Sequence, residues 1–196
     1  RQMCIRDRYY EALISSRDER LEHFTAVGVA VSQMCRDPLL LYSAQALEDH
    51  KQGLCTYAVE QVVLAIVVTT GIASIFLTKD YTPDYNSGLA HAIFYALTAY
   101  PVIEERHLHG EAVAFGILIA LLVDGQKEEF EKIYELNKSI GLPTRLSDIE
   151  ITPAQWEECL DRIPTMSDVA HYPYKVTRPM LENAMKTLEE RAVSHR

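Results

Sequence analysis

The chain has 196 residues, of which 48% are apolar, so it can bury a substantial core and is not expected to be disordered. Its 28 acidic and 19 basic residues give a net charge of -9, which is the wrong sign for a surface that binds phosphates, so we expect no nucleic-acid partner. Cys4, Cys35, Cys55 and Cys159 form no Cys-x-x-Cys pair, which favours reduced thiols in a cytoplasmic protein, and we expect Cys35 and Cys55 to pack as small apolar groups.

The N-terminal residues RQMCIRDR lack both an initiator methionine and the apolar segment of a signal peptide. They resemble translated sequencing-adapter sequence. We therefore expect residues 1–8 to be a non-native artefact and residues 9–196 to form one helical, metal-binding domain.

From Tyr9 onward the apolar spacing is mostly helical, and long strand-like alternation is missing, which predicts an all-α fold. Asp37 and Pro38 have the pattern of a helix start, with Asp as the cap and Pro at the first helical position. We therefore expect a helix to end before them and a new one to begin there. The predicted helices cover about residues 9–16, 24–36, 38–51, 55–77, 88–99, 110–123, 127–140, 154–162 and 179–190.

The run from Gln61 to Thr78 contains no charge and is only slightly shorter than the roughly 20 apolar residues that span a bilayer. Polar and small residues such as Thr70 and Gly71 dilute it, and Glu60 and Lys79 bound it without a basic bias on one side. We therefore predict a fully buried core helix and no membrane partner.

Three histidines, His91, His107 and His109, fall within one short region. On a single helix, His91 and His109 would lie about 27 Å apart, too far to share a metal ion bound at about 2.1 Å per nitrogen. Pro101 interrupts the helix between them, so the two imidazoles can face each other across a helical hairpin.

His109 should lie just before a helix that opens at Gly110, where the positive end of the helix dipole keeps a neutral imidazole available to a metal. The alternative from spacing alone is a pair of ordinary hydrogen-bonded histidines. His107 is a candidate to support the metal ligands by a hydrogen bond, but its charged neighbours favour a solvated loop histidine at that position.

The segments Ala90-His91-Ala92-Ile93 and HGEAVAFG, which begins at His109, are similar to the paired histidine segments of glycerol dehydrogenases. These enzymes form a branch of the iron-containing, metal-dependent alcohol dehydrogenase family. The resemblance extends from Tyr10-Glu11-Ala12 to about Glu190 and includes His171-Tyr172-Pro173. It implies the multi-helix C-terminal domain of a dehydroquinate synthase-like or glycerol dehydrogenase-like enzyme. It also implies that His91 and His109 are the catalytic metal ligands, with Zn²⁺ as the first choice and Fe²⁺ as the alternative.

Two elements of the family are missing from this chain. The third ligand of the family is an aspartate that aligns near position 4, where Cys4 stands, and Asp7 is out of register. The N-terminal α/β domain that binds NAD(P) is absent, and no G-x-G-x-x-G sequence occurs. We therefore expect the chain to be inactive by itself.

The resemblance implies that the full-length enzyme is an NAD(P)-linked, homo-oligomeric oxidoreductase acting on the CH–OH group of a small alcohol or polyol. Phe94 and Tyr95 stand where glycerol dehydrogenases typically have His-Asn, beside the substrate pocket. A 2-hydroxy-acid (hydroxycarboxylate) dehydrogenase of the same family is therefore an alternative. A non-catalytic all-α interaction module is an alternative of another class.

Overall fold

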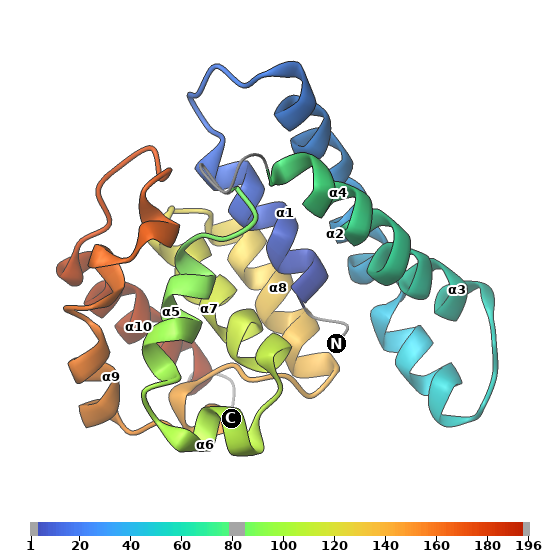
Figure 1. Cartoon of the computed structure of the whole chain (residues 1–196). Coiled ribbons are helices and arrows are strands. Elements are labelled where there is room, and N and C mark those ends of the chain that lie inside the picture. Colours follow the sequence, from blue (N-terminus) through green and yellow to red (C-terminus); the bar gives the residue numbers. More distant parts are fainter. Residues whose placement is uncertain (1–3, 79–84, 194–196) are drawn as a thin grey trace.

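The computed structural model describes residues 4–78 and 85–193, and these residues form helices and turns but no strand. This confirms the all-α prediction. Short 3₁₀ turns cover Leu146–Ile149, Ile163–Thr165 and Ser167–Val169, and a π-helical turn, Ala65–Thr69, joins α3 to α4. The α-helices, labelled in Figure 1, are α1 (Cys4–Ser15), α2 (His23–Lys51), α3 (Tyr57–Leu64), α4 (Thr70–Leu77), α5 (Leu89–Leu97), α6 (Pro101–Arg106), α7 (His109–Val123), α8 (Lys127–Ser139), α9 (Pro153–Cys159) and α10 (Arg178–Val193).

Helix α7 lies at the centre of the main core, because it is apolar on all sides and packs against α1, α5, α8 and α10. Its closest neighbour is α5. A Cβ atom on Gly116 would lie 2.7 Å from the carbonyl oxygen of Ala90, which is closer than real Cβ atoms approach a neighbour. Only glycine therefore allows the two helices to cross at this distance, and the crossing lies one residue from His91.

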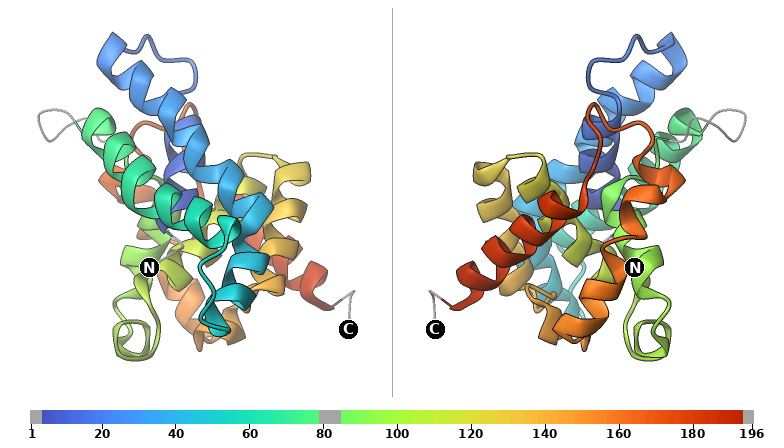
Figure 2. Two further views of the ribbon diagram at one scale, coloured as in Figure 1. Left: turned by 90° about the vertical axis from the view of Figure 1, so that its right-hand side faces the viewer. Right: turned by 90° about the vertical axis from the view of Figure 1, so that its left-hand side faces the viewer.

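A second layer is formed by α2 and the continuous run α3–π turn–α4, which lie side by side (Figures 1 and 2). They share a smaller apolar cluster that includes Cys35, Val62 and Leu77. A Cβ atom on Gly28 would lie 2.9 Å from Cβ of Phe76, so this glycine permits a close approach of α2 and α4. Helix α1 packs between this layer and α7.

Helix α2 corrects the predicted break at Asp37 and Pro38, because it continues unbroken through both residues. An internal proline removes one helical hydrogen bond, at a cost of about 3 kcal/mol. Residues on both sides of Pro38 are buried against the neighbouring helices, among them Cys35 before it and Leu39 after it. This burial holds the two halves in one helix despite the proline.

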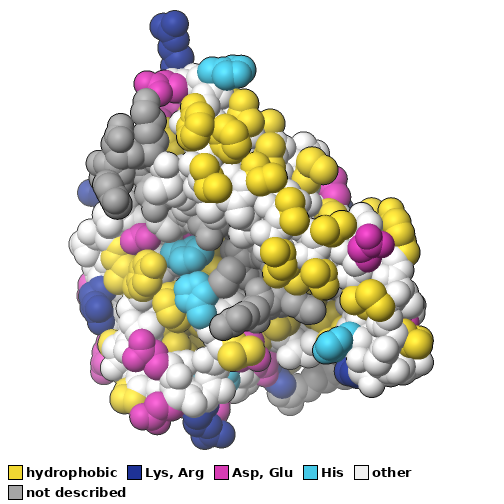
Figure 3. Space-filling view, turned by 45° about the vertical axis from the view of Figure 1, so that its right-hand side comes forward, with side chains coloured by type: hydrophobic (Ala, Val, Ile, Leu, Met, Phe, Trp, Pro, Cys, Tyr) yellow, Lys and Arg dark blue, Asp and Glu magenta, His cyan; other side chains and the backbone are white. Residues whose placement is uncertain are grey.

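The apolar helix from Tyr57 to Leu77 corrects the prediction of a fully buried core helix. Only 17% of its most apolar 18-residue window is buried, and Val67 and Ile75 are each 67% exposed. One side of the helix packs on α2, and among the described residues nothing covers the other side, so apolar side chains gather on one face of the molecule (Figure 3). By length and composition alone, this helix also qualifies as a candidate membrane span.

Two smaller predictions are also wrong. Cys35 is buried as expected, but Cys55 is exposed, because it lies in the turn that precedes α3. The side chain of His107 is only 11% exposed, since it lies between the carboxylates of Glu111 and Glu150. It is therefore not a solvated loop histidine.

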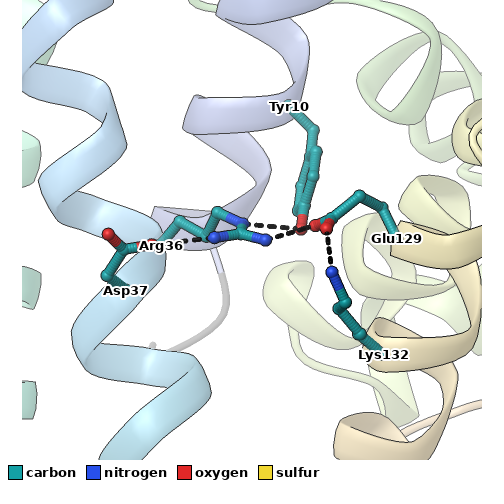
Figure 4. A network of polar contacts seen from close by, with 5 residues as sticks. All are labelled: Tyr10, Arg36, Asp37, Glu129 and Lys132. Carbon is teal, nitrogen blue, oxygen red and sulfur yellow. Dashed lines mark hydrogen bonds and ion pairs between the residues drawn. The ribbon is translucent and has the colours of Figure 1, made fainter.

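A polar network joins α1, α2 and α8 (Figure 4). The hydroxyl of Tyr10 donates to Glu129 at 2.7 Å, and the guanidinium of Arg36 donates to both residues. Burial by itself would raise the pKa of Glu129, but hydrogen bonds from Lys132, Arg36 and Tyr10 outweigh it and lower the pKa to about 2. This carboxylate is therefore part of an interhelical contact.

Candidate functional site

The structure brings His91 and His109 together. His91 lies in the first turn of α5 and His109 is the first residue of α7, with the short helix α6 between the two. The centroids of the two imidazole rings are 5.4 Å apart and their planes make an angle of 47°. The break at Pro101 therefore allows two histidines distant in sequence to lie next to each other, as the predicted hairpin requires.

His91 is buried, and a carboxylate from α1 holds its ring. Glu11 is fully buried, and its Oε2 lies 2.6 Å from Nδ1 of His91. Its Oε1 accepts a hydrogen bond of 3.0 Å from the backbone N–H of His91. The two oxygens of one carboxylate thus bind the backbone and the ring of the same histidine, which fixes the orientation of the imidazole.

Tyr172, from the C-terminal part of the chain, also packs at the start of α5. Its hydroxyl accepts a hydrogen bond of 3.2 Å from the backbone N–H of Leu89 at the start of α5. Burial, with the nearby charge of Glu11, raises the pKa of Tyr172 well above its usual value, so the phenol stays protonated at neutral pH. The His171-Tyr172-Pro173 segment is therefore joined to the histidine pair through Tyr172.

His109 is exposed and has an aromatic neighbour. Phe94 meets its ring edge-on, with centroids 4.3 Å apart and an interplanar angle of 79°. Tyr95 lies next to His91, with centroids 6.2 Å apart, and is 45% exposed. Phe94 and Tyr95 therefore flank the histidine pair.

The distance between the two histidines fits two ligands of one metal ion. A zinc ion about 2.1 Å from each of two imidazole nitrogens in tetrahedral geometry requires ring centroids about 5 to 6 Å apart. The observed separation of 5.4 Å lies within that range. In addition, Nε2 of His91 is the ring nitrogen that Glu11 does not use.

Within residues 4–78 and 85–193, no cluster of three or more His, Cys, Asp or Glu side chains has the arrangement of a complete metal site. The predicted position of the third ligand, at Cys4 and Asp7, falls among residues 1–8, whose side chains lie outside the described part of the structure. The described residues therefore offer two imidazoles at this point.

No family model matches this chain. Individual enzymes do match it. Hydroxycarboxylate dehydrogenase A of Escherichia coli is 29% identical over 187 residues, which is 93% of this chain and 50% of that enzyme. Glycerol dehydrogenase of Thermotoga maritima is 32% identical over 147 residues, which is 72% of this chain and 36% of that enzyme.

Solved structures share the fold. A probable glycerol dehydrogenase from Sinorhizobium meliloti superposes on this chain with a TM-score of 0.76 at 23% identity. The superposition covers 100% of this chain and 54% of the Sinorhizobium meliloti chain. Glycerol dehydrogenase of Schizosaccharomyces pombe superposes with a TM-score of 0.70 at 23% identity. That superposition covers 86% of this chain and 42% of the Schizosaccharomyces pombe chain.

The chain is thus a relative of the glycerol dehydrogenases and hydroxycarboxylate dehydrogenases, which confirms the family predicted from the histidine segments. More narrowly, it corresponds to their helical domain and spans about half the length of hydroxycarboxylate dehydrogenase A.

Proposed function

We propose that this chain is the metal-binding domain of an NAD(P)-linked oxidoreductase that acts on the CH–OH group of a small alcohol or polyol. The observation that carries the proposal is the 5.4 Å spacing of the imidazoles of His91 and His109, two residues that lie 18 positions apart in the sequence. The kinship with glycerol dehydrogenases supports the reaction class. In such an enzyme, the helical half that this chain represents binds the metal, and the α/β half binds NAD(P).

His91 and His109 are the proposed metal ligands. Zn²⁺ is the first choice and Fe²⁺ the alternative, because two imidazoles and a carboxylate suit either ion. When bound, such an ion is a Lewis acid that lowers the pKa of a coordinated hydroxyl. We infer that the third ligand is a carboxylate from the segment that precedes Tyr9 in the family, and that residues 1–8 of this chain are non-native.

The residues of this chain orient the reacting groups. Glu11 fixes the ring of His91, and Phe94 packs against the ring of His109. Tyr95, on the exposed side of α5, and Phe94 form an apolar wall beside the pair. Such a wall reduces the access of water to the reacting centre and limits the size of the substrate.

A 2-hydroxy acid is the second candidate substrate. Two observations favour it. Hydroxycarboxylate dehydrogenase A matches 93% of the chain, and Phe94 and Tyr95 stand where the resemblance implies His-Asn in glycerol dehydrogenases. Phe94 offers no hydrogen-bonding group to a polyol.

The experiment that tests the function measures turnover of the polypeptide that carries this domain together with its nucleotide-binding half. Glycerol, other small polyols and 2-oxo acids are compared with NAD(H) and NADP(H). We expect zinc-dependent turnover of one of these substrates, and we expect His91→Ala and His109→Ala to abolish it. Turnover that needs neither Zn²⁺ nor Fe²⁺, or full activity in either variant, would contradict the proposal.

The setting of the protein follows from the same kinship. We propose that it is cytoplasmic, in line with its three free cysteines among the described residues, and that the full-length enzyme is a homo-oligomer. We propose no nucleic-acid partner, given the net charge of -9. The partners are then a small hydroxylated substrate and NAD(P).

A further inference from the structure

We propose that Glu11 is a positioning residue that holds His91 in the tautomer with the proton on Nδ1, so that Nε2 is the nitrogen presented to a metal. The inference deepens the proposed function and rests on it for the role of the metal. The central claim, the tautomer of His91, concerns the protein without a metal. The resemblance assigned a role to the two histidines and none to Glu11.

The hydrogen-bond roles follow from the geometry. A backbone N–H can only donate, so Oε1 of Glu11, at 3.0 Å from the nitrogen of His91, is an acceptor. A carboxylate has only acceptor oxygens, so Oε2 also requires a donor. Nδ1 of His91, at 2.6 Å, must then carry the proton.

The start of α5 has no side-chain cap of its own. Gly88 is the N-cap of α5 and has no side chain to satisfy the first N–H groups, and Glu11 binds the N–H of the third residue of the helix instead. The positive end of the α5 dipole stabilises a negative charge there. Glu11 from α1 thus replaces the missing cap of α5.

Close packing leaves Glu11 little freedom to turn away. A Cβ atom added to Gly88 would lie 3.3 Å from Cγ of Glu11 and 3.2 Å from Cε2 of Tyr172. The carboxylate is therefore enclosed between α1, the start of α5 and the ring of Tyr172. In metal sites generally, a ligating histidine gives its second N–H to a carboxylate or carbonyl, and loss of that partner lowers metal affinity about 10- to 100-fold.

The first test is the tautomer of His91 in the metal-free, ¹⁵N-labelled chain at pH 8, measured by long-range ¹H–¹⁵N correlation spectroscopy. We expect a protonated Nδ1 and an unprotonated Nε2. A His91 ring with its proton on Nε2 would overturn the proposal, whatever the variants do.

The second test is Glu11→Gln, which keeps the shape of the side chain. If the amide oxygen stays on the backbone N–H of His91, the amide nitrogen faces Nδ1 and donates to it, which moves the ring proton to Nε2. We expect this change of tautomer and a fall of about 10- to 100-fold in Zn²⁺ affinity, measured by competition with a chromophoric chelator. Glu11→Asp keeps the charge but shortens the side chain, and we expect it to retain the Nδ1–H tautomer only in part.

The matched control is Glu129→Gln, since this partly buried carboxylate binds Tyr10 on the same helix and does not contact His91. We expect wild-type tautomer and wild-type zinc affinity in this variant. If Glu11→Gln binds zinc as tightly as the wild type and keeps its tautomer, the positioning role is wrong while the metal site stands. If a polypeptide that also carries the native segment before Tyr9 has the Nδ1–H tautomer but binds no zinc, the positioning of the ring stands and the proposed function fails.

Discussion

Tyr10, Arg36 and Glu129 show how single polar side chains hold the helices around the site. They connect α1 to α2 and α8, and α1 is the helix that carries Glu11 to His91. Glu129 is 22% exposed and Arg36 is 19% exposed, so solvent screens this pair less than a surface ion pair. The network therefore contributes to the stability of the domain.

Glu129→Gln tests this contribution through its pH dependence. The folded-state pKa of Glu129, about 2, lies below its ordinary value of 4.5. The unfolded chain therefore takes up this proton first as the pH falls, so the stabilisation is complete above pH 4.5 and is lost toward pH 2. The shift sets an upper bound on the order of 3 kcal/mol.

In urea unfolding, we expect wild type to exceed Glu129→Gln in unfolding free energy at pH 6 and the difference to shrink as the pH is lowered to 3. The isosteric change Glu128→Gln, one position earlier on the exposed side of α8, serves as the control. A difference between wild type and Glu129→Gln that is constant with pH would show that the network acts through shape and not through charge.

At the scale of single residues, the sequence predicted that His91 and His109 form the site. It did not predict that the carboxylate of Glu11 contacts His91. His91 and His109 stand in recognisable segments, whereas Glu11 is one carboxylate among 28 acidic residues. Its burial depends on how α1 packs against α5, and no local spacing encodes that contact. His107 was misjudged for the same reason, because its burial depends in part on Glu150, which is distant in sequence.

The crossing of α5 and α7 is the feature of the helices on which the site depends. Gly116 on α7 meets the backbone of Ala90 on α5, and His91 is the next residue. A larger residue at the crossing must separate the two helices. The spacing of His91 and His109 is therefore set by the absence of a side chain at position 116.

Gly116→Ala is expected to destabilise the domain by about 1 to 3 kcal/mol, as overpacking of a core does. It should also weaken zinc binding, because α5 must move relative to α7. Thermal unfolding and chelator competition measure the two effects. Gly71→Ala is the control: a Cβ atom there meets nothing within 4 Å, so the change should be neutral or stabilising by up to about 1 kcal/mol. Wild-type zinc affinity in Gly116→Ala would show that the crossing does not set the imidazole spacing.

Most helices could be predicted from the sequence, because their apolar spacing, glycines and prolines are local signals. The predicted helix at residues 110–123 matches α7, and that at residues 127–140 matches α8, to within one residue at each end. The break at Pro38 was wrong because burial on both sides outweighs the local cost of proline. The prediction also missed α6, since six residues give too little periodicity to detect.

At the scale of the whole molecule, exposed apolar side chains gather on one face. The face formed by α3, the π turn and α4 exposes Val63, Val67, Val68, Ile72 and Ile75 by 41% to 67%. The run from Gln61 to Thr78 has no charge, so two such faces can meet without burying an ion. Apolar composition predicted burial of this helix, but coverage depends on which elements or chains pack against it, and sequence composition does not determine that.

We expect this chain by itself to self-associate through that face. Sedimentation velocity should detect dimers or larger species at micromolar concentrations in the wild type and mainly monomer in the double variant Val67→Glu and Ile75→Glu. Val193→Glu on α10 is the control, because Val193 is 66% exposed but lies away from the face, and it should associate as the wild type does. Equal association of the double variant and the wild type would mean that another surface is responsible.

The most direct measurement of the metal site is anomalous diffraction at the zinc edge from crystals of the chain grown with Zn²⁺, combined with the same measurement on His109→Ala. The account predicts one strong peak bonded to both His91 and His109, which the substitution removes. A zinc ion bound elsewhere, or a peak that touches only one of the two imidazoles, would contradict the assignment of this domain as the metal-binding half of a dehydrogenase.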